Sequence, residues 1–276
     1  MGYQVEIIEA SPEPGGMLRW AIPSFRLPKH ILDRDIRYLE KMGVIIKTDI
    51  KFGVDVSLSD VRKGGANAVI IAIGTHQSLA LPVANAESFR RYMDCLTFLK
   101  KYANGEPVDL GKKVVVVGAG NSGIDAARAA LRCGAKEATM IDVLDSKEIA
   151  CDKDEMKEAE EEGVKVSYLT TPVRIIGKAG EIQGLECRIA DKQTIVMDAT
   201  SIIVAIGQHP DFSWNKEGLA FKLSPKNTLI VEDSQTNIEG VFAAGDVVNG
   251  PTTVVEAMAG GKKAASAVGA YLCGEA

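Results

Sequence analysis

Runs of apolar residues alternate along the chain with stretches whose apolar positions recur every three to four residues. The runs 68–73, 114–117 and 201–207 are almost entirely apolar, which is typical of parallel strands that are buried on both faces. Residues 32–42 instead place their apolar side chains on one side of a helix. Strands that alternate with helices predict an α/β fold with parallel sheets.

Weaker patterns extend this alternation along the chain. A short helix is expected at 59–62 with Ser59 as its cap, and another at 124–131. The segment 154–163 is rich in charges and ends at a glycine, so we interpret it as a helix with a solvated face. Further strands are expected at 3–9, 44–50 and 138–143, followed by antiparallel strands at 164–169, 173–176, 182–189 and 194–197.

A glycine-rich loop in mid-chain predicts a dinucleotide site. Gly118, Gly120 and Gly123 follow four valines and open a helix, which is the context that gives this spacing its meaning. Gly118 is expected to make the tight turn, Gly120 to let a pyrophosphate approach the backbone, and Gly123 to let the helix pack on the strand. Between them, Asn121 and Ser122 are expected to touch the cofactor. The alternative is a tight strand-to-helix turn without a ligand.

The next strand ends in acids, about 20 residues after the glycines, where a Rossmann site selects between nicotinamide nucleotides. Asp142 and Asp145 stand there without an arginine. A carboxylate accepts hydrogen bonds from ribose hydroxyls, whereas a 2'-phosphate needs cationic partners. The sequence therefore favours NADH over NADPH, with Asp142 or Asp145 contacting the ribose. Alternatively, both acids only cap the following turn.

The last strand predicts a second cofactor. Apolar residues lead into Gly245-Asp246, a pattern typical of flavoproteins in which the acid binds the ribityl hydroxyls of FAD. Residues 250–253 then open a helix whose free N–H groups suit an anion. Near the other end of the chain, Glu9 is placed to bind the adenosine ribose of FAD, and Gly15-Gly16 follow directly.

These motifs predict two domains. Turn-forming residues 104–107 precede the strand with four valines, so we place a junction near Leu110. The NAD(P)H-binding domain is expected at 110–227. It interrupts a discontinuous FAD-binding domain formed by 1–109 and 228–276.

Composition limits the remaining classes of function. The chain has 276 residues and a net charge of -5 without a basic cluster, which disfavours nucleic acid and anionic membranes as partners. Its apolar runs are too short to span a membrane, and no signal peptide is visible. Five cysteines without a C-x-x-C spacing argue against a metal ribbon, an iron–sulfur cluster or a redox dithiol, so a reduced, cytoplasmic protein is expected.

The segment Pro14–Pro28, PGGMLRWAIPSFRLP, closely resembles the signature of the glutamate synthase small subunit family, which includes the flavin subunit of NAD-dependent dihydropyrimidine dehydrogenase. The resemblance spans the chain and implies a two-dinucleotide flavoprotein fold of the pyridine nucleotide-disulfide oxidoreductase type. In that family NAD(P)H reduces FAD, and electrons leave through iron–sulfur clusters to a partner subunit. The residues implied to surround FAD are Glu9, Gly15, Gly16, Leu18, Arg26, Gly74, Thr75, Gly245, Asp246 and Thr253, and those implied to surround the nicotinamide nucleotide are Gly118, Gly120, Asn121, Ser122, Gly123, Asp142 and Gly207.

The chain departs from the family pattern in three ways. The cysteine-rich cluster domain is missing, and so are the first FAD strand and its glycine loop, which would precede Met1. Val143-Leu144 stands where many members carry two arginines for NADP. We therefore expect weak FAD binding by the isolated chain, and a companion segment, upstream or on another chain, that completes the FAD fold.

The leading hypothesis is an NADH-oxidising flavoprotein component that passes electrons to a partner. The alternative is a non-catalytic nucleotide-binding or assembly subunit, or a truncated fragment, that has lost FAD. A disulfide reductase resembling thioredoxin reductase shares the fold but is disfavoured because C-x-x-C does not occur. Hydride transfer needs positioned rings more than an acid–base pair, so no catalytic residue is assigned.

Overall fold

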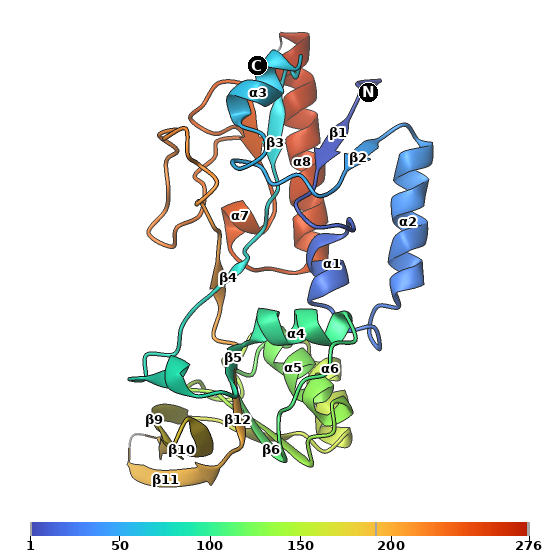
Figure 1. Cartoon of the computed structure of the whole chain (residues 1–276). Helices are drawn as coiled ribbons and strands as arrows, with labels where there is room; N and C mark the ends of the chain where they lie inside the picture. The colour runs from blue at the N-terminus through green and yellow to red at the C-terminus, as the bar shows by residue number, and fades with distance from the viewer. Residues whose placement is uncertain (1, 191, 275–276) are drawn as a thin grey trace. The chain divides into compact units, whose positions relative to one another are not determined.

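The computed structural model describes residues 2–190 and 192–274, which form two compact units (Figure 1). Unit 1 consists of Met1–Pro14, Asp33–Gln77 and Gly207–Ala276. Unit 2 consists of Gly15–Leu32 and Ser78–Ile206. Each unit has its own apolar core. No helix in the described residues is both long enough and apolar enough to cross a bilayer.

A five-stranded sheet forms the centre of unit 2, in the order β5-β12-β6-β7-β8, with every neighbouring pair parallel. The central strand, β6, has the four valines, and each of them is at most 3% exposed. β8 was expected to be antiparallel, and this was wrong: it follows a helical crossover from β7, which returns the chain in the parallel direction. The strands are β5 (Tyr92–Asp94), β6 (Lys113–Val117), β7 (Glu137–Ile141), β8 (Lys165–Ser167) and β12 (Ser201–Val204).

Helices cover one face of this sheet. The central helix, α5 (Asn121–Arg132), packs on β6 and β7 because its inner residues are small: Ala126, Ala127 and Ala130 are fully buried. On either side of α5 lie α4 (Cys95–Ala103) and α6 (Lys153–Glu161), and the short α1 (Gly16–Trp20) packs on α4.

The other face of the sheet is covered by an antiparallel sheet. It contains β9 (Thr170–Lys178), β10 (Glu181–Ile189) and β11 (Gln193–Asp198), as the sequence predicted. Leu185 and Cys187 of β10 pack in one apolar cluster with Val115 and Val117 of β6. The glycine-loop strand is thus buried on both faces.

Unit 1 contains two parallel strand pairs, β1 (Glu6–Ile8) with β2 (Ile45–Lys47), and β14 (Val241–Ala243) with β3 (Val69–Ile71). The short α3 (Leu58–Lys63) is capped by Ser57, not by Ser59 as expected, because Ser57 and Asp60 form a capping box. Of the remaining elements, α7 (Asp246–Asn249), α8 (Val254–Cys273) and β13 (Gln208–His209) lie in unit 1, and the 3₁₀ helix η1 (Ala86–Ser88) lies in unit 2. The helix α2 (Lys29–Lys41) and the short β4 (Gln77–Ser78) include residues of both units.

Contacts group three segments differently from the predicted domains. Residues 78–109 lie in unit 2, where β5 pairs with β12 and α4 packs on α5. Residues 207–227 lie in unit 1, where Trp214 packs against Phe52 and Phe221. The segment Gly15–Leu32 lies in unit 2.

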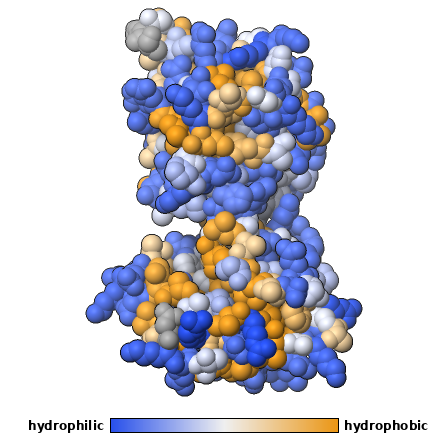
Figure 2. Space-filling model, turned by 90° about the vertical axis from the view of Figure 1, so that its left-hand side faces the viewer, coloured by the Kyte–Doolittle hydropathy of each residue, from blue (hydrophilic) through white to orange (hydrophobic). Residues whose placement is uncertain are grey.

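Apolar side chains reach the surface of both units, as the orange areas of Figure 2 show. In unit 1 they include residues of the paired strands themselves: Ile7 is 39% exposed, Ile45 42% and Ile70 41%. In unit 2 they include Val143 and Leu144, which follow β7.

Candidate functional site

The glycine loop joins β6 to α5, and two of its glycines are required by close backbone contacts. A Cβ on Gly118, whose φ is +111°, would lie 2.2 Å from the carbonyl oxygen of Ala205. A Cβ on Gly123 would lie 2.1 Å from the carbonyl oxygen of Gly118. At Gly120 an added Cβ would meet nothing within 4 Å. The loop is therefore tightly packed against the backbone at Gly118 and Gly123, and it has free space at Gly120. This free space fits the approach of a phosphate to the first N–H groups of α5.

The polar side chains beside the loop are bonded to the backbone. The Asn121 amide oxygen accepts from the N–H of Asp152 at 2.8 Å. The Asp142 carboxylate accepts from the N–H of Ala119 at 2.8 Å and from that of Leu144 at 3.0 Å. Asp145 accepts from the N–H of Lys147 at 3.1 Å. Both acids thus make the turn contacts that the alternative interpretation expected, and their contact with a nucleotide stays a prediction.

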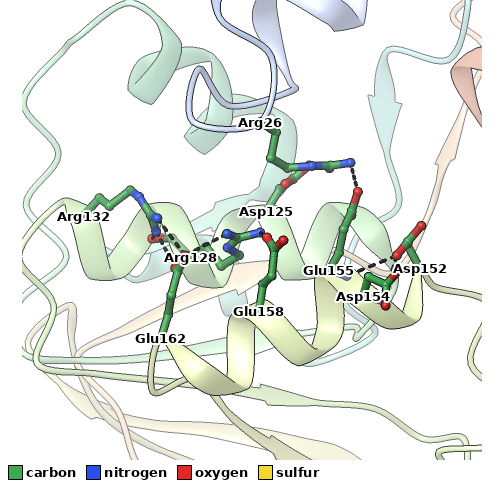
Figure 3. A network of polar contacts seen from close by, with 9 residues as sticks. All are labelled: Arg26, Asp125, Arg128, Arg132, Asp152, Asp154, Glu155, Glu158 and Glu162. Atoms are coloured by element: carbon green, nitrogen blue, oxygen red, sulfur yellow. Dashed lines mark hydrogen bonds and ion pairs between the residues drawn. The ribbon is translucent and has the colours of Figure 1, made fainter.

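A network of charged side chains lies on α5 and α6 (Figure 3). Arg26, from the loop after α1, forms ion pairs with Asp125 of α5, at 2.7 Å, and with Glu155 of α6. The Asp125 side chain is only 6% exposed, and this burial raises its pKa to about 6 against the opposing effect of Arg26. Burial also raises the pKa of Glu155.

The network continues along both helices. Arg128, which is buried, forms ion pairs with Glu158 at 2.9 Å and with Glu162 at 2.7 Å, and Arg132 holds Glu162 at 2.6 Å. The hydrogen bond from Arg132 lowers the pKa of Glu162 to about 2. These acids therefore pair with α5, while Lys157, Glu158 and Glu161 remain exposed, as expected for a helix with a solvated face.

A sequence signal for this network existed. Asp125, Arg128 and Arg132 are spaced by three and four residues along α5, and the acids at 155 and 158 of α6 and at 162, its C-cap, have the same spacing. Such spacing puts each set on one face of its helix. Helix faces of opposite charge predict a contact only when the two helices are known to be neighbours. The spacing of residues along the sequence does not show which helices are neighbours.

Phe25 adds an aromatic contact beside Arg26. Its ring centre lies 3.9 Å from the Arg132 guanidinium carbon and 4.9 Å from that of Arg128, and its edge meets Tyr102. These contacts attach the segment Gly15–Leu32 to unit 2. Arg26, implied by resemblance to contact FAD, binds two carboxylates here, and its contact with FAD stays a prediction.

In unit 1, the turn at Gly245-Asp246 forms a second group. Gly245 has a φ of +76°, and a Cβ on Gly260 of α8 would lie 3.2 Å from its nitrogen. The Asp246 carboxylate accepts from the Thr252 hydroxyl at 2.9 Å, while burial raises its pKa. Thr253 caps α8 in a capping box with Glu256. A helix glycine thus packs on a loop glycine here, as Gly123 packs on Gly118 in unit 2.

The other predicted residues are distributed over both units. In unit 1, a Glu9 carboxylate oxygen accepts from the N–H of Ser11 at 2.8 Å, and Thr75 is fully buried. Gly74 and Gly207, also in unit 1, have φ of +67° and +123°. The FAD set lies in unit 1 at Glu9, Gly74, Thr75, Gly245, Asp246 and Thr253, and in unit 2 at Gly15, Gly16, Leu18 and Arg26.

Residues 1–261 match the family described as pyridine nucleotide-disulphide oxidoreductase. Among curated relatives, the chain is 33% identical to the NADPH-Fe(3+) oxidoreductase subunit beta of Geobacter sulfurreducens, covering 98% of this chain and 47% of that one. It is 34% identical to the NADP(+)-dependent formate dehydrogenase subunit beta of Moorella thermoacetica, covering 98% and 41%. It is 33% identical to the NAD-dependent dihydropyrimidine dehydrogenase subunit PreT of Escherichia coli K12, covering 99% and 64%. The chain thus spans about half the length of these relatives.

Solved structures show the same fold. Thioredoxin reductase of T. acidophilum superposes with a TM-score of 0.77 at 20% identity, covering 100% of this chain and 92% of that one. FprA of Mycobacterium tuberculosis superposes with a TM-score of 0.81 at 15% identity, covering 98% and 78%. The predicted fold class is confirmed.

Proposed function

We propose that the chain, which belongs to the pyridine nucleotide-disulphide oxidoreductase family, carries electrons from NADH through FAD to a partner subunit. The observation that carries this proposal is the glycine loop between β6 and α5. Gly118 and Gly123 have no room for a side chain, whereas Gly120 has free space around it. When bound, NADH supplies a hydride and FAD accepts it. The first N–H groups of α5 hold the pyrophosphate, and the packed glycines keep them in place.

The FAD side of the proposal rests on residues of unit 1. Asp246 is half-buried at the start of α7 and keeps acceptor capacity for hydroxyls beyond its bond to Thr252. An added Cβ at Gly250 would meet nothing within 4 Å, so the backbone before α8 is open to a ligand. These features support a flavin site in which Asp246 and the start of α8 bind the cofactor.

We propose NADH as the preferred nucleotide. Val143 and Leu144 are exposed directly after β7, where a 2'-phosphate needs cations, and the Asp142 carboxylate lies beside them. The relatives include proteins named for NADPH, for NADP(+) and for NAD, so the family alone leaves the choice open.

The partner is proposed to be an iron–sulfur or catalytic subunit that accepts the electrons. All three relatives are named as subunits, which supports the proposal that this chain functions as part of a complex. The five cysteines are free thiols, which supports a reduced, cytoplasmic location. A particular link to glutamate synthase stays a prediction.

We further propose that a companion segment with a strand and a glycine-rich turn pairs with β1. Parallel strands normally lie inside larger sheets with both faces covered, whereas Ile7 and Ile45 of the β1-β2 pair are exposed. Amide hydrogen exchange of residues 6–8 in the isolated chain and in its native complex tests this. Exchange must slow in the complex, and equal rates would contradict the companion.

Purification with native partners, followed by absorbance and kinetics, tests the function. We expect flavin absorbance and NADH-dependent reduction of ferricyanide. Gly120→Val should abolish NADH oxidation without unfolding the chain, because its Cβ enters the space open to phosphate, while Gly261→Val, equally open but on α8, should leave it unchanged. Nucleotide binding without flavin would instead favour the assembly subunit.

A further inference from the structure

The Asp142 carboxylate connects two loops at the end of the sheet of unit 2. β6 and β7 are parallel neighbours in register from Lys113 with Glu137 to Val117 with Ile141, so the loops that follow them begin side by side. One Asp142 oxygen accepts from the N–H of Ala119 at 2.8 Å, and the other accepts from the N–H of Leu144 at 3.0 Å.

The neighbouring contacts show what Asp142 adds. The backbone holds Gly118, whose N–H donates to the carbonyl of Ile141 at 2.8 Å. One residue later, the N–H of Ala119 donates to a side chain instead. Ala119 is fully buried, so its N–H needs an acceptor within the protein. Asp142 is therefore the group that fixes the Gly118–Ala119 peptide, one residue before Gly120.

We propose that Asp142 is a positioning residue for nucleotide binding, holding the Gly118–Ala119 peptide so that the loop enters Gly120 in the form that receives the pyrophosphate. The inference rests on the proposed function of unit 2 as the nucleotide site. It differs from the ribose contact expected from the sequence, because an acid that acts through the loop affects NADH and NADPH alike. An acid that contacts the ribose affects mainly the choice between them.

The test compares Asp142→Ala with Asp142→Asn in the full chain. Binding of NADH and NADPH is titrated by the change in nicotinamide fluorescence. We expect Asp142→Ala to weaken both about tenfold, the effect of losing one charge-assisted hydrogen bond, with an unchanged ratio of the two affinities. Asn keeps one amide oxygen for the Ala119 N–H and should restore most of both affinities.

A matched control is Asp211→Ala. Asp211 makes the same two-residue turn contact, accepting from the N–H of Ser213 at 2.8 Å, but lies in unit 1. It should leave both affinities unchanged. A shift of the affinity ratio toward NADPH in both Asp142 variants, or unchanged binding in Asp142→Ala, would overturn the proposal.

Amide hydrogen exchange at Ala119 gives a second measurement that needs no nucleotide. Exchange should accelerate in Asp142→Ala and remain slow in Asp142→Asn. If the unaltered chain binds neither nucleotide, the proposed function fails, and equal exchange at Ala119 in all variants would separately show that Asp142 does not hold the loop.

Discussion

Both units contain apolar parallel strands, but β6 of unit 2 and β1 of unit 1 differ sharply in burial. In unit 2, β6 pairs on both edges and is covered on both faces, so its valines are at most 3% exposed. In unit 1, β1 pairs with β2 alone among the described residues, and Ile7 is 39% exposed. An apolar strand sequence therefore predicts a strand, while the number of its neighbours decides how much it stabilises the fold.

The largest expected effect comes from truncating the same residue type in each sheet. Ile203 of β12 is fully buried, so Ile203→Ala should destabilise unit 2 by about 4 kcal/mol, whereas Ile7→Ala should cost less than about 1 kcal/mol in unit 1. Each unit contains one tryptophan, Trp20 in unit 2 and Trp214 in unit 1. Urea unfolding followed by fluorescence in Trp214→Phe and Trp20→Phe backgrounds therefore reports each unit. Equal costs would show that the β1 strand is as well supported as β12.

The next largest effect on stability is expected from Arg26→Ala. This substitution tests whether the segment Gly15–Leu32 stabilises the rest of unit 2. Arg26→Ala leaves the Asp125 carboxylate buried without its cation, and we expect a loss of about 3 kcal/mol in urea unfolding followed by Trp20 fluorescence. Adding Asp125→Asn should recover part of it. The matched control is Arg34→Ala, because the Arg34–Asp35 pair is 68% and 65% exposed and should contribute nothing measurable. A similar loss in both variants would remove the special role of Arg26.

A smaller difference in the loss of stability is expected between alanine substitutions of two helix glycines, Gly123 of α5 and Gly260 of α8. Gly123→Ala places a Cβ 2.1 Å from a carbonyl oxygen and should cost about 2 kcal/mol in unit 2. Gly260→Ala places it 3.2 Å from a backbone nitrogen, and the gain in helix propensity of about 1 kcal/mol should offset this crowding. The same single-tryptophan urea series measures both. A large loss from Gly260→Ala would mean that unit 1 is packed as tightly as unit 2.

The last comparison concerns pH. The pKa of Glu162 is lowered from 4.5 to about 2, so its contribution is complete above pH 4.5 and is lost as the pH falls toward 2. Asp125 has the opposite sign, since its pKa is raised to about 6 and the stability it contributes is lost as pH rises from about 4 to 6. The urea midpoint of unfolding, measured between pH 2 and 7, should therefore depend less on pH in the two variants. The dependence should weaken below pH 4.5 in Glu162→Gln and between pH 4 and 6 in Asp125→Asn. An unchanged profile in both would contradict these shifts.

The sequence predicted a helix, strand or loop well where a single local residue pattern determines that element. The four valines and three glycines predicted β6, its loop and α5, because strand burial and close backbone contact each require particular residues. Partnerships between distant segments were not predictable. Arg26 and Asp125 lie 99 residues apart, and β8 follows β7 in parallel only because α6 carries the chain back. Likewise, the acid at 142 was predicted to be a site residue, but its bond to Ala119 depends on the register of two strands.

The division of the chain between units has a practical consequence for protein engineering. The chain passes from one unit to the other four times, after Pro14, Leu32, Gln77 and Ile206. A single protease cut therefore releases neither unit as an intact piece. A gene for unit 2 alone must join Leu32 to Ser78 through a new linker, and a gene for unit 1 needs two such joins. Deleting the short Gly15–Leu32 piece would remove Phe25 and Arg26 and expose the Asp125 side of α5.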